Sequence, residues 1–428
     1  MTETSKPNIL LIMTDQHTAS AMSCDGNPWV DTPAMDALAG RGVRFNKAYV
    51  TQPLCLPSRS SLQTMRYPHE IGTVSNGRDI EGDPPAFGKA MGDAGYLCAY
   101  VGKWHVGMSF EDAGYEEAYE PGHDDKKTET IVSFLEREHD RPFFLTASYM
   151  NPHNICQLAR GQELPDGPIG EPPADIDQLP PLPPNFDIPE NEPSAIRKVQ
   201  RENTEFHYPT QDWGERDWRN YLWGYYRIVE KVDQEIGRVL KTLQDTGLDQ
   251  HTVVIYTSDH GEGVAMHRWN QKQILYDQST RVPTIISGPG GSKPGTSETL
   301  VSVNLDIPAT ILDFAGADKP DAARGDSLRP FVTDPEATLD RSYVVSETMF
   351  ARGAQNLGLT GRMLRTQRYK YCIYDSGENR EQLFDMTEDP GETVNLAVTD
   401  GPELDRHRNL LSEWARETGD IDFPYHAP

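Results

Sequence analysis

Four short runs of apolar, β-branched and aromatic residues recur along the chain, and helical patterns separate them. The runs cover residues 8–13, 96–101, 143–148 and 252–257. Uninterrupted apolar runs of this length are typical of strands that a parallel sheet buries on both faces. Their alternation with helices predicts an α/β fold.

Two helices are located by their ends and their apolar spacing. Thr32 is a favourable N-cap, and Pro33 suits the first helical position. From residue 227 to about 243, apolar residues recur on one helical face, and Gly247 follows the end of this segment.

The pattern changes twice in the second half of the chain. Residues 164–193 contain ten prolines and predict a long surface loop. Residues 342–346, 368–374 and 382–385 predict short antiparallel strands, and residues 404–418 a terminal helix. We therefore predict a catalytic α/β domain over residues 1–339 and a smaller C-terminal subdomain over residues 340–428.

The chain has 428 residues and a net charge of −26, which argues against nucleic acid as a partner because that would require a basic face. An anionic substrate would need a local basic pocket. No apolar run reaches the roughly 18 residues of a membrane span, so no membrane association is expected. The start of the chain does not resemble a signal peptide, which predicts a cytoplasmic location for the sequence as it stands, or a periplasmic or secreted one if a leader was removed.

The five cysteines are too few and too widely spaced for a disulfide framework. Cys24, Cys98, Cys156 and Cys372 are expected to be buried thiols. Cys55 stands in a more specific sequence.

Polar and charged side chains follow directly after each predicted strand. They are Asp15 and Gln16 after the first, Lys103 and His105 after the second, His153 after the third, and Asp259 and His260 after the last. Taken singly, each could be a helix cap or a loop hydrogen bond. Because ligands of open α/β sheets bind beyond the carboxyl ends of the strands, four such endings together favour one common site.

The residue types at these endings indicate the chemistry of the site. Asp15, Gln16 and Asp259 offer hard oxygen atoms and His260 a nitrogen, which suits Ca²⁺, Mg²⁺ or Mn²⁺ better than a soft metal. In an extended segment Lys103 and the residue two positions later would point the same way and could bind a tetrahedral anion.

The segment that begins at Cys55 carries the most specific signal. Cys55, Pro57, Ser58 and Arg59, followed by Leu62, Thr64, Arg66, Pro68 and Gly72, resemble the sulfatase signature C-x-P-S-R and L-x-T-G-R-x-P-x-x-x-G. Residues 102–107 are similar to the family's G-K-W-H-x-G element, residues 152–153 to its Pro-His element and residues 259–262 to its second metal-ligand segment. Lys272 stands at the spacing of the family's sulfate-binding lysine. The resemblance to the formylglycine-dependent type I sulfatases extends over nearly the whole chain.

This resemblance implies a fold and a cofactor set. The fold would be an alkaline-phosphatase-like α/β/α sandwich with a mixed, mainly parallel central sheet and a small C-terminal α+β subdomain with an antiparallel sheet. A maturation enzyme would convert Cys55 to formylglycine. One divalent cation, in first place Ca²⁺, would be bound by position 55 together with Asp15, Gln16, Asp259 and His260.

The resemblance also implies a role for each catalytic residue. The hydrated aldehyde at position 55 would attack sulfur, while Arg59, Lys103 and Lys272 would stabilise charge on the transferring group. His153 would protonate the leaving oxygen, and His105 would take a proton so that the aldehyde reforms.

Three single positions and one loop depart from the family's pattern. Gln16 stands where many sulfatases have a second Asp, His260 replaces the Asn found in many members, and Met65 fills a usual Gly position. Residues 265–270 diverge in the loop expected to read the substrate.

The sequence therefore predicts hydrolysis of an organic sulfate ester, on a sugar rather than on a simple aryl group; the substrate would be a small molecule or an oligosaccharide. Candidate substrate contacts are His69, Arg78, His267, Arg268 and Arg281. One alternative is a phosphonate monoester or phosphodiester hydrolase of the same superfamily. Another is a noncatalytic relative that binds sulfated glycans.

Overall fold

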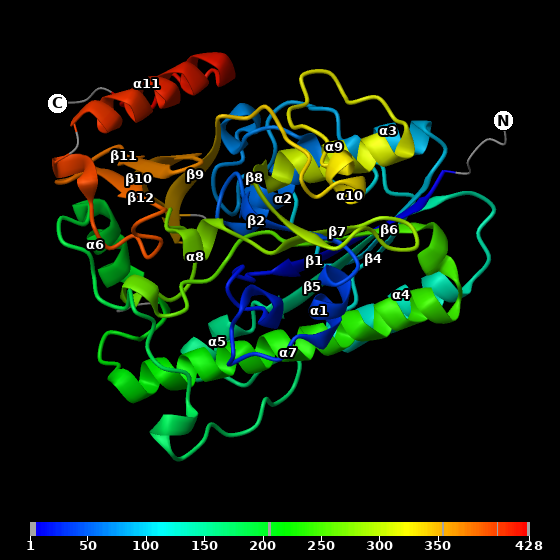
Figure 1. Ribbon diagram of the computed structural model, residues 1–428, viewed down its shortest axis with the longest axis horizontal. Coiled ribbons are helices and arrows are strands. Elements are labelled where there is room, and N and C mark those ends of the chain that lie inside the picture. Colours follow the sequence, from blue (N-terminus) through cyan, green and yellow to red (C-terminus); the bar gives the residue numbers. More distant parts are fainter. Residues whose placement is uncertain (1–5, 204–206, 353–354, 400, 426–428) are drawn as a thin grey trace.

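The computed structural model describes residues 6–203, 207–352, 355–399 and 401–425. An eight-stranded sheet with the order β4-β3-β5-β1-β6-β7-β2-β8 runs through its centre (Figure 1). The strands are β1 (Asn8–Asp15), β2 (Val43–Tyr49), β3 (Leu97–Gly102), β4 (Glu117–Tyr119), β5 (Phe143–Pro152), β6 (Thr252–Ser258), β7 (Thr284–Ser287) and β8 (Gly295–Ser302). Neighbours are parallel except for β7, which is antiparallel to β6 and β2. The four predicted strands are β1, β3, β5 and β6, side by side in this sheet.

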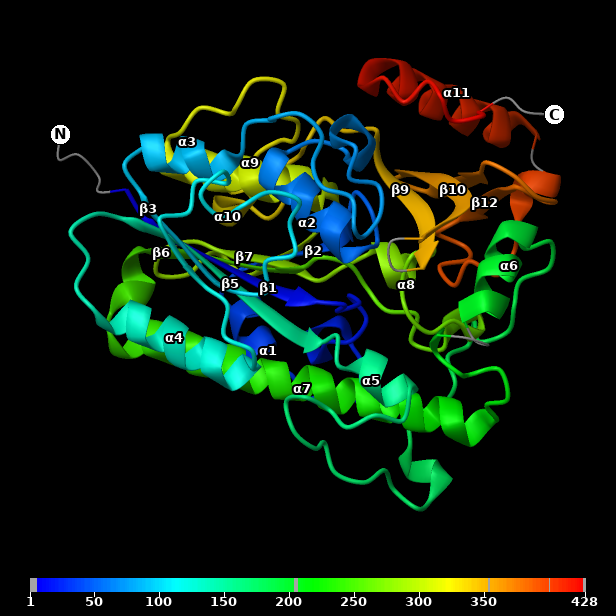
Figure 2. The same ribbon diagram turned by 180° about the vertical axis from the view of Figure 1, so that it is seen from behind.

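Helices cover both faces of the sheet (Figures 1 and 2). One layer contains α1 (Pro33–Ala39), α4 (Asp124–Glu136), α5 (Ile155–Ala159) and α7 (Glu215–Asp245); the other contains α2 (Cys55–Thr64), α3 (Phe87–Asp93), α9 (Val303–Ala315) and α10 (Arg329–Thr333). Leu10 and Ile12 of β1 pack into the first layer with Val232 of α7, whereas Ile9 packs into the second with Phe87 of α3. The alternation of side chains along a strand thus builds two cores, and the predicted α/β/α sandwich is confirmed.

The predicted boundaries of α7 were wrong at its N-terminal end. The helix begins at Glu215 rather than near residue 227. Trp218, Leu222 and Tyr225 continue the buried face toward the N-terminus at helical spacing. Aromatic residues and Gly224 interrupt the aliphatic pattern there, which hid the first three turns from the sequence analysis.

Helix α1 begins at Pro33, as predicted, but Thr32 does not cap it. The Thr32 side chain makes no capping hydrogen bond. Instead, Asp233 of α7 accepts the free backbone N–H groups of Ala34 and Met35 at 3.0 and 2.9 Å. A carboxylate from a neighbouring helix thus satisfies the helix terminus.

A second, four-stranded antiparallel sheet has the order β12-β11-β10-β9. Its strands are β9 (Tyr343–Arg352), β10 (Gln355–Thr366), β11 (Tyr369–Tyr374) and β12 (Glu381–Asp385). Helix α11 (Gly401–Thr418) lies along the outer side of this sheet, where Leu411 and Trp414 pack against Leu364 and Ile373 (Figure 1). Strand β10 was not predicted from the sequence. The domain boundary after residue 339 stays a prediction.

Strand β9 is bonded to two segments of the larger sheet's layers. The backbone N–H of Glu347 donates to the carbonyl of Thr51 at 2.7 Å, and the hydroxyl of Ser346 donates to the carbonyl of Val50 at 2.5 Å. The hydroxyl of Thr348 donates to the carbonyl of Gln273 at 2.7 Å. The small sheet therefore fixes the chain just before α2 and just after Lys272.

The proline-rich stretch forms the predicted surface loop, with a single 3₁₀ turn at Ile176–Gln178. It is followed by α6 (Ser194–Glu202), and α8 (Asp277–Thr280) precedes β7. All five cysteines lie in the described part of the chain as free thiols; Cys98, Cys156 and Cys372 are buried as predicted, whereas Cys24 is only partly buried. Within the described ranges, no helix has both the length and the apolar character that crossing a bilayer requires.

Candidate active site

The carboxyl ends of four neighbouring parallel strands bring the predicted site residues together. Asp15 ends β1, Lys103 follows β3, His153 follows β5 and Asp259 follows β6. Because β3, β5, β1 and β6 are adjacent, these residues lie along one edge of the sheet. Cys55 reaches the same edge as the first residue of α2.

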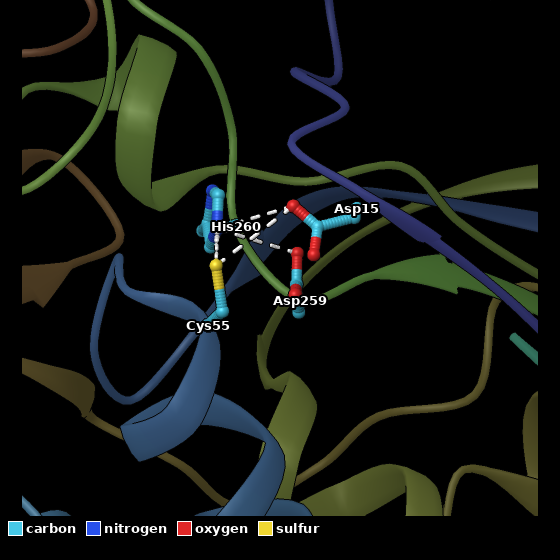
Figure 3. A group of neighbouring side chains, drawn as sticks. All are labelled: Asp15, Cys55, Asp259 and His260. Carbon is cyan, nitrogen blue, oxygen red and sulfur yellow. Dashed lines mark hydrogen bonds and ion pairs between the residues drawn. The ribbon is translucent and has the colours of Figure 1, made fainter. Parts of the chain in front are cut away.

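Asp15, Cys55, Asp259 and His260 form a buried cluster in which one potential ligand atom of each lies within 4.8 Å of all the others (Figure 3). The Cys55 Sγ atom is 3.1 Å from His260 Nε2 and 3.9 Å from Asp15 Oδ1. His260 Nε2 is 3.7 Å from Asp15 Oδ1 and 3.5 Å from Asp259 Oδ1. Two carboxylates, an imidazole and position 55 thus point toward one another.

The charges of this cluster suit a bound cation. His260 Nδ1 donates to the carbonyl of Gly261 at 2.9 Å, so the lone pair of the neutral ring is on Nε2 and faces the cluster. Burial and the neighbouring Asp15 raise the pKa of Asp259. Two buried carboxylates in such proximity repel each other unless a positive charge lies between them, and the donor set therefore fits a divalent metal ion.

Gln16 turns its amide oxygen toward Lys272, which also contacts Cys55. Its Nε2 donates to Glu262 Oε2 at 2.6 Å, and because a carboxylate only accepts hydrogen bonds, this contact fixes which end of the amide is which. Gln16 Oε1 accepts from Lys272 Nζ at 2.9 Å. Glu262 is fully buried and accepts two further bonds, from the Tyr221 hydroxyl at 2.6 Å and the Gln271 N–H at 2.7 Å.

Arg59 contacts residues of four neighbouring strands, or of the segments directly after them, behind the cluster. Its Nε donates to Asp259 Oδ2 at 2.7 Å, and its Nη1 donates to the carbonyl of Lys103 at 2.8 Å and to Ser148 Oγ at 2.9 Å. One more nitrogen lies 3.4 Å from Asp15 Oδ2. Burial disfavours the charge, but these carboxylates outweigh it and raise the pKa of Arg59. The guanidinium group is thus a permanent positive charge beneath the site.

Two lysines surround Cys55. Lys103 pairs with Asp15, and Lys272 Nζ lies 3.2 Å from Cys55 Sγ. Burial opposes ionisation of the thiol, but Lys103, Lys272 and His260 outweigh burial and hold the pKa of Cys55 well below its ordinary value. Position 55 therefore lies in a place that favours a negative charge.

His153 lies nearby at the end of β5. Burial disfavours its protonated form, but Cys156 and Asp15 outweigh burial and raise the pKa of His153 to about 9. The ring is thus protonated near neutral pH and can donate a proton.

The backbone around Lys272 is strained. Gln271 and Gln273 on either side have φ values of 78° and 75°, and Gln16 opposite has 72°. Residues other than glycine rarely adopt this left-handed backbone conformation, which costs about 1–3 kcal/mol for each such residue. Strain of this kind accumulates where a functional group must be held in one place.

A pocket of about 500 Å³ opens above Cys55. It is lined by Leu54, Cys55, Asn76, Lys103, His105, His153, Arg160, Asn203, His207, Tyr208, Lys272 and Gln273. Six of these twelve described residues are basic and none is acidic. The pocket is thus the local basic site that the net charge of the chain made necessary for an anionic substrate.

The five predicted substrate contacts do not line this pocket. Arg78 is exposed on the loop that also carries the pocket residue Asn76. His69 Nδ1 instead contacts Glu347 Oε1 at 2.6 Å. Arg281 lies between Asp25 and Asp277.

The other two lie in the loop after β6. His267 is buried and stacks on Tyr276 with a centroid distance of 4.1 Å. Arg268 is exposed and contacts Asp187 at 3.3 Å. Substrate contact by these five residues stays a prediction.

The sequence analysis did not single out Glu262, Arg160, His207 or Tyr208. Glu262 was visible only as the last residue of the Asp-His-Gly-Glu segment. The other three come from the end of α5 and from the connection before α7, where no strand end marks a site. Only their proximity in the folded chain reveals them.

Comparison with known proteins decides the family. The model of the Sulfatase family matches residues 7–317. The chain belongs to the sulfatase family. A second model, described as N-sulphoglucosamine sulphohydrolase, C-terminal, matches residues 265–413 of this sulfatase.

Named relatives define the reaction class. A Delta 4,5-hexuronate-2-O-sulfatase of Bacteroides thetaiotaomicron is 32% identical over 97% of the chain and 90% of its own length. A solved 2-O GAG sulfatase superposes with a TM-score of 0.84 at 31% identity and covers 97% of this chain and 93% of its own. The sulfatase described here is therefore a sulfuric ester hydrolase.

Enzymes that hydrolyse phosphonate esters share this fold. The phosphonate monoester hydrolase of Agrobacterium radiobacter superposes with a TM-score of 0.77 at 22% identity, over 97% of this chain and 95% of its own. This likeness shows the alkaline-phosphatase-like fold that the sequence predicted.

Proposed function

We propose that this sulfatase removes a sulfate group from a sugar, with formylglycine at position 55 and a divalent cation. The observation that carries the proposal is the position of Cys55, in a pocket whose described charged residues are all basic and beside a cluster of hard ligands. The named sugar sulfatases among its relatives support a carbohydrate substrate.

The proposed metal ligands are Asp15, Gln16, Asp259, His260 and position 55. A bound divalent cation supplies a Lewis acid that polarises a sulfate oxygen. The hard oxygen atoms and single imidazole nitrogen of these ligands suit Ca²⁺ in first place, with Mg²⁺ and Mn²⁺ as alternatives.

Formylglycine supplies a hydrated aldehyde as nucleophile in place of a thiol. Lys103 and Lys272 flank position 55 and would hold the sulfate oxygens as negative charge moves onto the leaving group. Protonated His153 would give its proton to the leaving sugar oxygen. His105, on the same pocket wall, would accept a proton from the hydroxyl at position 55 and so allow sulfate to leave.

The test is peptide mass spectrometry across Cys55, in protein produced together with a formylglycine-generating maturation enzyme, combined with sulfate release from sulfated sugars. The expected result is the mass of formylglycine and release of sulfate in proportion to the converted fraction. Full activity of a chain with unmodified cysteine would refute this mechanism.

A phosphonate monoester or phosphodiester hydrolase is the second candidate, because two solved phosphonate monoester hydrolases share the fold. Matched sulfate and phosphonate esters of one alcohol distinguish the two. Higher kcat/KM for the phosphonate would make the second candidate the correct one.

A further inference from the structure

We propose that Arg160 forms a second anion subsite in the active-site pocket and binds the carboxylate of a uronate whose sulfate lies at Cys55. This inference rests on the proposed function and names the class of sugar on which it acts.

The charge of the pocket exceeds what one sulfate ester needs. Lys103 and Lys272 lie beside Asp15 and Cys55, at the place where the sulfate would bind. Arg160 lines another part of the wall and contributes a further full charge, and no described lining residue is acidic. Lys103 is paired with Asp15 and Lys272 lies against Cys55, whereas no described carboxylate pairs with Arg160, so the pocket has a cation left for a second negative group of the ligand.

The guanidinium group of Arg160 is already held in place. Its Cζ atom lies 4.4 Å from the centroid of the Tyr208 ring, and its Nε donates to the carbonyl of His207 at 3.1 Å. Tyr208 is fixed in turn, since its hydroxyl contacts Cys156 Sγ at 3.6 Å. Stacking and one hydrogen bond reduce the entropy that binding would otherwise cost.

The free edge of this group fits a planar acid. With Nε bonded to His207, the two terminal nitrogens remain for a ligand, and among the described residues no carboxylate forms an ion pair with Arg160. Two parallel N–H groups match the two oxygens of a carboxylate. The relative named as a hexuronate 2-O-sulfatase shows that a sugar with one sulfate and one carboxylate is a substrate class within reach of this family.

The experiment compares three methyl glycosides that differ only at C6: glucuronoside 2-sulfate, glucoside 2-sulfate and glucoside 2,6-disulfate. Arg160→Met keeps much of the side-chain length but removes the charge. We expect kcat/KM for the glucuronoside to fall about ten- to hundredfold, mainly through KM, because a charge-assisted pair is lost. The value for the glucoside 2-sulfate, which is uncharged at C6, should change less than threefold, and Arg160→Lys should lie between the parent and Arg160→Met.

Arg137→Met is the matched control. Arg137 also lies 4.4 Å from an aromatic ring, that of Phe134, and it pairs with Glu117 outside the pocket. Thermal unfolding of both variants separates loss of the stacking contact from loss of the subsite. The control should leave all three substrates unaffected.

Equal losses on all three substrates would overturn the subsite, and equal losses on the glucuronoside and the disulfate would overturn the choice of a carboxylate. Calorimetric binding of the same compounds to Cys55→Ser, with and without Arg160→Met, gives the comparison without turnover. If the parent chain released no sulfate, the proposed function would fail. The binding ratio would still support or overturn the role of Arg160.

Discussion

Glu262 is predicted to control metal binding without touching the metal. Its carboxylate accepts from Gln16 Nε2 at 2.6 Å and so turns the Gln16 oxygen toward Lys272 and the proposed metal ligands. Glu262→Gln keeps the shape and leaves one oxygen for Tyr221 and the Gln271 N–H. Its new amide nitrogen would face Gln16 Nε2, and the contact is restored only if the Gln16 amide turns over.

The size of the expected loss in metal affinity follows from the contacts that the reversed Gln16 amide would lose. Lys272 Nζ, now 2.9 Å from an oxygen, would face an NH₂ group, and a hydrogen bond to a charged donor is worth about 1.5–3 kcal/mol. The oxygen offered to the cation is lost as well, and changes in the groups that orient metal ligands typically cost about 10–100-fold in affinity. A tenfold loss of affinity corresponds to about 1.4 kcal/mol. The free energy of the lost hydrogen bond and the expected loss of metal affinity therefore agree.

The assay is a Ca²⁺ titration followed by thermal unfolding, which needs no turnover. Glu192→Gln is the control, since Glu192 is also buried and accepts from a tyrosine, Tyr276, at 2.9 Å. We expect both variants to be less stable than the parent, but only Glu262→Gln to bind Ca²⁺ more weakly. A Ca²⁺ affinity of Glu262→Gln within twofold of that of the parent would refute the claim that Glu262 orients Gln16.

Three further predictions concern other parts of the molecule. Lys272→Ala should lower kcat about 10²–10³-fold, measured by sulfate release, and an unchanged kcat would remove Lys272 from the reaction. Chelation with EDTA should lower the Tm, because Asp15 and Asp259 then repel each other, and added Ca²⁺ should restore it; a Tm indifferent to EDTA would contradict a bound cation. Burial disfavours protonated His69, but Glu347 raises the pKa of His69 from 6.5 to about 9. Its stabilisation, up to about 3 kcal/mol, is complete below pH 6.5 and lost toward pH 9, so His69→Gln should lower the Tm at pH 6 but not at pH 10.

The strands that the sequence revealed are those buried on both faces. Strands β1, β3, β5 and β6 occupy the middle of the sheet and are continuously apolar. Strand β8 forms one edge and β2 lies beside it; Arg44 and Lys47 of β2 are partly exposed, and Glu298 of β8 is exposed. Strands with such solvated positions have a composition like that of a loop, and hydrophobic runs cannot reveal them.

The centre of the site was predictable and its walls were not. Asp15, Lys103, His153 and Asp259 follow strands, and the rule for parallel sheets brings such residues together without knowledge of the loops. Arg160 follows a short helix, and its place in the pocket depends on the path of the chain between α5 and α7. A charged residue near a recognised motif does not necessarily line the pocket. His69, for example, pairs with Glu347 instead.

The attachment of β9 to the chain before α2 limits the time during which Cys55 can be modified. Cys55 is only 2% exposed, and every residue of α2 is buried, so a modifying enzyme has no access to this thiol in the folded chain. The strand that fixes the preceding segment begins at Tyr343, about 290 residues later. At about 5–20 residues per second, a ribosome needs roughly 15–60 s to make that stretch. The proposed conversion of Cys55 therefore precedes the folding of this segment, and the synthesis time up to β9 is the shortest interval available for it.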